Sequence, residues 1–82
     1  MDLIGIRNKN NRQWRLRMYS KLKKLGYKHK PSLSYGQYLI INPNKEFELI
    51  SNDIFDAFIF SNHIMYEAIN EEDFFNFLNK DE

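Results

Sequence analysis

Residue types that could support metal or nucleophile chemistry are sparse in this chain. The most compact set of possible metal ligands combines one histidine with three carboxylates, namely Asp53, Asp56, His63 and Glu67. Neither histidine has the spacing of a helical metal-binding motif, and acids beside a hairpin usually form a solvated rim. The serines lie outside any GxSxG nucleophile elbow, and there is no cysteine. We therefore expect no metal, no cofactor and no enzymatic activity.

The charged residues are divided along the chain. Residues 1–30 contain ten Lys or Arg and one Asp, a net charge of +9, whereas residues 31–82 contain two Lys and ten Asp or Glu, a net charge of −8. A basic surface attracts phosphates or an acidic protein, and an acidic surface can occupy a groove that normally holds nucleic acid. The division makes both modes of binding available, and it also allows the two halves to neutralise each other within the fold.

Two sets of candidate binding residues follow from this division. The acidic set, which could imitate the phosphates of a nucleic acid, consists of Glu46, Glu48, Asp53, Asp56, Glu67, Glu71, Glu72 and Asp73. The alternative set, which could bind nucleic acid directly, consists of Arg12, Arg15, Arg17, Tyr19, Lys21, Lys23, Lys24, Lys28 and Lys30. In the second set Tyr19, together with Tyr27, could stack on bases.

A long amphipathic helix is expected to carry most of the basic set. The apolar residues Trp14, Met18, Leu22 and Leu25 recur at spacings of four, four and three, which predicts a helix over residues 11–25. We expect Asn10 to cap its start with Gln13 in a capping box, and Gly26 to end it. Leu16 and Tyr19 lie among the basic residues of this helix, where they could contact a base or a partner protein, or be covered by a neighbouring segment.

The middle of the chain predicts a β-hairpin. Residues 37–41 and 46–50 alternate as strands around a turn centred on Pro43 and Asn44. That turn would place Tyr38, Ile40, Phe47 and Leu49 on one face, beneath the helices. The opposite face would then carry Leu39, Ile41, Glu46, Glu48 and Ile50 and be at least partly solvated.

The remaining segments complete an α+β fold. Residues 27–36 have the composition of an exposed loop, and residues 51–62 fit either a short helix or the start of a second hairpin. Residues 63–69 suggest a strand antiparallel to the hairpin. Asn70 and the acids after it predict a short C-terminal helix over residues 71–79, with an apolar face of Phe74, Phe75, Phe77 and Leu78.

We therefore expect one compact domain over residues 1–82, with a long N-terminal amphipathic helix, a small antiparallel sheet of three or four strands, and a short C-terminal helix. No apolar run reaches the roughly 18 residues of a membrane span. The first residues do not read as a secretion signal, so a cytoplasmic location is expected.

In its size, its lack of cysteine, its content of Asn, Lys, Ile and Phe, and its acidic C-terminal part, the chain resembles the small proteins of bacteriophages and mobile elements, including anti-CRISPR and other anti-defence inhibitors. The resemblance implies a binding protein that occupies a surface of a host nucleic-acid-handling protein or nuclease complex. A small DNA- or RNA-binding protein is the alternative. A third possibility is an assembly protein whose basic and acidic surfaces pair head to tail.

Overall fold

The computed structural model describes residues 2–9, 11–31, 36–60 and 64–80. Its elements, in chain order, are β1 (Asp2–Arg7), α1 (Arg12–Lys24), β2 (Lys28–His29), β3 (Tyr38–Ile41), β4 (Glu46–Ile50), α2 (Asn52–Phe60), β5 (Ile64–Ala68) and α3 (Glu71–Lys80). The predicted α+β class is confirmed. The described chain opens with a strand, however, and the helix that follows has 13 residues.

The sheet is larger than expected and is mixed. Its five strands lie in the order β2-β4-β3-β1-β5, with β1–β5 and β2–β4 parallel and β1–β3 and β3–β4 antiparallel. The prediction of a small antiparallel sheet was therefore wrong in two places. The segment expected to be a loop at residues 27–36 contributes the short edge strand β2, and β5 pairs with β1 rather than with the hairpin.

Strand β1 is the element that the sequence analysis missed. Leu3, Ile4 and Ile6 are all buried, because the strand lies between two others and is covered on both faces. Such a strand has a continuous apolar run instead of an alternating one. Gly5 lies among these residues, and a Cβ there would lie 2.9 Å from Ile40 Cγ2. The missing side chain lets Ile40 of the adjacent strand β3 and Phe55 of α2 pack closely against β1.

The hairpin forms with a register one residue away from the predicted one. Lys45 adopts φ +60°, and the Asn42 N–H donates to the Glu46 carbonyl at 2.8 Å. This is a turn with a left-handed third residue, which adds one residue to the loop. Ile41, and not Ile40, therefore lies opposite Phe47.

A shift of one residue moves a strand's side chains to the opposite face. Phe47 and Leu49 face α1 as predicted, but they do so together with Leu39 and Ile41. Tyr38, Ile40 and Ile50 pack on the other side of the sheet. This face, expected to be partly solvated, is covered by Phe55 of α2.

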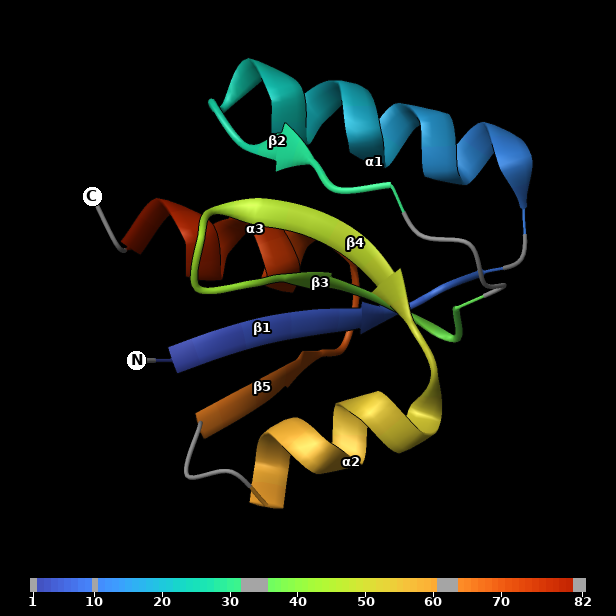
Figure 1. Ribbon diagram of the computed structural model, residues 1–82. Coiled ribbons are helices and arrows are strands. Elements are labelled where there is room, and N and C mark those ends of the chain that lie inside the picture. The colour runs from blue at the N-terminus through green and yellow to red at the C-terminus, as the bar shows by residue number, and fades with distance from the viewer. Residues whose placement is uncertain (1, 10, 32–35, 61–63, 81–82) are drawn as a thin grey trace.

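The helices thus form a layer on each side of the sheet. Figure 1 shows α1 and α3 on one side and α2 on the other. The open choice for residues 51–62 resolves as a helix over Asn52–Phe60, while residues 61–62 lie outside the described part. None of the helices in the described ranges is long and apolar enough to cross a membrane.

Helix α1 has the predicted face with two corrections. Trp14, Met18 and Leu22 are buried, but Leu25 follows the last helical turn and is 43% exposed. The cap is Asn11, whose Oδ1 accepts hydrogen bonds from the backbone of residues 13 and 14. The predicted cap, Asn10, lies outside the described residues. Gly26 ends the helix at φ +95°, as expected.

Helix α3 was predicted well. Asn70 Oδ1 accepts from the Asp73 N–H at 2.9 Å, and the Asp73 carboxylate accepts from the Ile69 N–H at 3.0 Å. Phe74 and Leu78 are buried in the core beneath α1 and α3. The predicted end at residue 79 differs from the observed one by one residue.

Candidate polyanion-binding surface

Helix α1 carries six cations and no acid. Like charges three and four residues apart on a helix repel each other, and a cation in the first turn opposes the helix dipole. The repulsion weakens this helix unless acids from elsewhere offset the charge. The positions of those acids divide α1 into two sides.

The side of α1 that faces α3 is neutralised within the protein. The Arg17 guanidinium donates a hydrogen bond to the Glu71 carboxylate, and Lys21 Nζ lies 3.9 Å from the second oxygen of the same group. Burial alone would raise the pKa of Glu71, but the hydrogen bond and charge of Arg17, with further contributions from Trp14 and Lys21, together outweigh it and hold that pKa below its ordinary value. We call Arg17 and Lys21 the paired flank.

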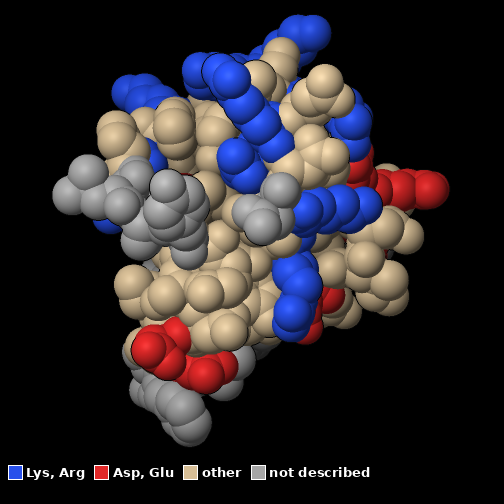
Figure 2. All heavy atoms as spheres, turned by 90° about the vertical axis from the view of Figure 1, so that its right-hand side faces the viewer, with Lys and Arg blue, Asp and Glu red and all other residues tan. Residues whose placement is uncertain are grey.

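The outer face of α1 has no such partner. We define it as the cations of α1 outside the paired flank, namely Arg12, Arg15, Lys23 and Lys24, and among the described residues none of these forms an ion pair. At about 100° per residue, Lys24 lies next to Arg17, at the border with the paired flank. Arg15 is half-buried and the other three are exposed. Figure 2 shows Lys and Arg gathered over the end of the molecule that carries α1, with some Asp and Glu beside them and a further group of Asp and Glu toward the opposite end.

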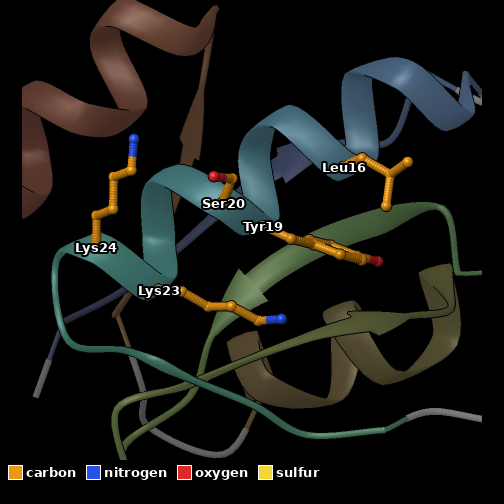
Figure 3. Close-up of a pocket in the computed structure, with 5 residues that line it drawn as sticks. All are labelled: Leu16, Tyr19, Ser20, Lys23 and Lys24. Carbon is orange, nitrogen blue, oxygen red and sulfur yellow. The ribbon is translucent and has the colours of Figure 1, made fainter.

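A shallow hollow of about 420 Å³ lies on this outer face, lined by Leu16, Tyr19, Ser20, Lys23 and Lys24. Leu16 is 54% exposed. In Figure 3, Leu16, Tyr19 and Lys23 project from one side of the helix and Ser20 and Lys24 from the other. The sequence analysis did not include Ser20 among the candidate residues. Its small side chain, between the longer side chains of Leu16 and Lys24 on the same helix, could have indicated a hollow there.

Tyr19 is held by an aromatic cluster beneath the outer face. Its ring centroid lies 4.9 Å from that of His29 and 5.2 Å from that of Phe47, and His29 stacks on Phe47. Burial raises the pKa of Tyr19, and the Arg15 charge opposes this effect. Tyr27 also packs against the core. Of the apolar side chains suggested as contacts, Leu16 is therefore the exposed one.

The last two cations of the basic set lie on and beside β2, at one edge of the sheet. Lys28 and Lys30 are exposed, and Lys30 Nζ lies 3.7 Å from Glu48 Oε2. Asn42 Nδ2 donates to Glu48 at 2.7 Å and to Glu46 at 3.3 Å. Glu46 and Glu48 are half-buried and already engaged within the protein.

The other members of the acidic set lie on three different elements. Asp53 and Asp56 are exposed on α2, Glu67 is exposed on the opposite edge strand β5, and Glu72 is exposed in the first turn of α3. Asp73 contributes to the start of α3 and Glu71 binds α1. The fold thus brings together the cations of α1 but distributes the acids over four elements.

Among the described residues no group of three or more metal-ligating side chains comes together. His63, the histidine of the possible metal set, lies outside those residues. No family model, curated protein or solved structure matches the chain.

Proposed function

We propose that this protein is a small binding protein that takes up nucleic acid through the outer face of α1. The supporting observation is the contrast between the two sides of the helix. Glu71 offsets Arg17 and Lys21, whereas four cations on the outer face have no acid partner in the described structure. A polyanion would offset those charges, and phosphate neutralisation by Lys and Arg dominates nucleic-acid affinity.

The proposal is tested by two variants matched in chemistry. Arg12→Gln with Lys23→Gln removes one Arg and one Lys from the outer face, and Arg17→Gln with Lys21→Gln removes one of each from the paired flank. Both lower the net charge by two and stay on the same helix. We expect the outer-face variant to bind a labelled oligonucleotide about tenfold or more weakly near 0.1 M salt. The paired-flank variant should bind more nearly like the parent protein.

Equal losses of affinity in the two variants would contradict the assignment of the outer face. Strong binding that survives in the outer-face variant would do the same. Thermal unfolding of each variant is the control, because Arg12 and Lys23 are exposed and should contribute little to stability.

A second candidate is an inhibitor that places acids on the basic groove of a host nucleic-acid-handling protein, in the manner of anti-defence proteins. The observation that favours it is on α2, where Asp53 and Asp56 are exposed beside Ile54, which is 48% exposed. Exposed apolar surface bordered by charge is typical of protein contacts. This candidate would act from the side of the sheet opposite to α1.

The two candidates make opposite predictions for Asp53→Lys with Asp56→Lys. An inhibitor acting through α2 would lose its protein partner in this variant, measured by co-purification from the host. A nucleic-acid-binding protein acting through α1 would keep its affinity for an oligonucleotide. Both sites are exposed, so folding should be preserved.

A further inference from the structure

Phosphate binding by itself gives no role to Leu16. This side chain is 54% exposed on a helix whose other outer residues are cationic or polar. Cations recognise the backbone of a nucleic acid, and an apolar side chain contributes nothing to that contact. An exposed aliphatic side chain within a cationic face instead offers apolar surface that the flat face of a base would cover, through burial and van der Waals contact.

Leu16 borders a hollow instead of projecting alone from a convex surface. Ser20 lies one helical turn after Leu16 and one turn before Lys24, so a small side chain stands between two long ones. The result is the hollow of about 420 Å³ in Figure 3, with Tyr19 and Lys23 along one side. Leu16, Tyr19, Ser20, Lys23 and Lys24 therefore border one hollow, with Lys23 and Lys24 on opposite sides of the helix.

We propose that this hollow seats one unpaired base, and that the ligand of the outer face is therefore single-stranded nucleic acid. The inference rests on the proposed function, because it assigns the form of the nucleic acid bound there. Leu16 contacts the face of the base, and Lys23 and Lys24 bind the phosphates on either side of it. In a duplex the base faces are stacked on each other, so Leu16 would have nothing to contact.

The experiment compares an oligothymidylate with an abasic oligonucleotide of the same length and charge, each fluorescently labelled and titrated with the full chain at low salt. Burying about 40 Å² of apolar surface between a base and one aliphatic side chain changes affinity by about fivefold. We expect the oligothymidylate to bind tighter by about that factor. Leu16→Ser should abolish the difference while leaving the affinity for the abasic strand unchanged.

Leu25→Ser is the matched control, because Leu25 is also an exposed leucine next to α1 but does not line the hollow. It should preserve the preference for the strand that carries bases. A duplex of the same length should bind equally to the parent protein and to Leu16→Ser, because its stacked bases do not contact Leu16.

Three results would overturn this inference while leaving the proposed function intact. They are equal affinity for the abasic and base-bearing strands, a Leu16→Ser variant that keeps the difference, and duplex binding that depends on Leu16 as strongly as single-strand binding does. Failure of all three ligands to bind at low salt would instead refute the proposed function itself, and this inference with it.

Discussion

The paired flank and the outer face of α1 both carry Lys and Arg, but within the described ranges only the paired flank forms ion pairs with an acid of the folded protein. Arg17 and Lys21 contact Glu71 of α3, while Arg12, Lys23 and Lys24 on the outer face have no acid partner in the described structure. The strong charge division along the chain is thus partly cancelled by the fold itself. The contrast teaches that a count of charges in a segment does not identify a binding surface. The charges that the fold leaves unpaired are the informative ones.

The largest expected effect on stability concerns the buried face of α1. The packing of this face fixes which cations point toward α3 and which lie on the outer face. Leu22 is fully buried, so Leu22→Ala should lower the free energy of unfolding by about 2–4 kcal/mol. Leu25→Ala is the control and should change it by less than about 0.5 kcal/mol because that side chain is exposed. Denaturant unfolding followed through the single tryptophan, Trp14, measures both. Similar unfolding midpoints for the two variants would show that the buried face of α1 is wrongly assigned.

A smaller effect is expected on the paired flank. Glu71→Gln removes the partner of Arg17 and Lys21 and should cost about 1 kcal/mol or less, as is typical of partly exposed ion pairs. Glu72→Gln is the control for the helix dipole, because Glu72 is an exposed acid in the same first turn. Equal losses of stability in the two variants would argue against a specific role for the ion pair.

The lowered pKa of Glu71 predicts how the stability of the protein changes at acid pH. The folded protein holds the pKa of Glu71 below its ordinary value of 4.5, so the unfolded chain takes up the proton first as the pH falls. The stabilisation by Glu71 is therefore complete above that value and is lost as the pH drops through the lower pKa of the folded state. The difference in stability between the parent protein and Glu71→Gln should narrow over this acidic range. A difference that stays constant with pH would contradict the assigned ion pair.

The smallest effect concerns the turn that decides which sheet residues lie beneath α1. Lys45 adopts φ +60°, a conformation that glycine takes without strain and that β-branched residues resist. Lys45→Gly should raise the free energy of unfolding by about 0.5 kcal/mol, and Lys45→Val should lower it. The reverse order in thermal unfolding would show that the turn does not have this geometry.

The elements that carry a periodic pattern were predictable from the sequence. Trp14, Met18 and Leu22 identified α1, and Asn70 with the acids after it identified α3. The strands that the sequence analysis missed or paired wrongly depend on contacts between distant segments. Strand β1 is buried on both faces and lacks alternation, β2 pairs over only two residues, and β5 joins β1 across a long sequence separation.

The prediction of the hairpin register was wrong for a local reason. A turn centred on Pro43 and Asn44 is compatible with either a two-residue loop or a loop extended by Lys45. The difference is a single backbone angle at a residue type that rarely adopts it. That angle moved Tyr38 and Ile40 to the α2 side.

The candidate surface was predictable as a composition but not as an arrangement. The sequence identified the basic residues of α1 and the aromatic side chain among them. Which cations remain unpaired depends on the docking of α3 against α1, and the packing of Tyr19 on His29 depends on the pairing of β2 with β4. Neither contact has a local signal in the sequence.

The most direct test of the central claim is the salt dependence of oligonucleotide binding. With about 0.7 counterions released per phosphate contact on a single strand, the four cations of the outer face predict a slope of about −3 for the logarithm of the association constant against the logarithm of the salt concentration. The slope should fall to roughly half in Arg12→Gln with Lys23→Gln. An absence of binding at low salt, or a slope that this variant leaves unchanged, would contradict the assignment of the outer face of α1 as the binding surface.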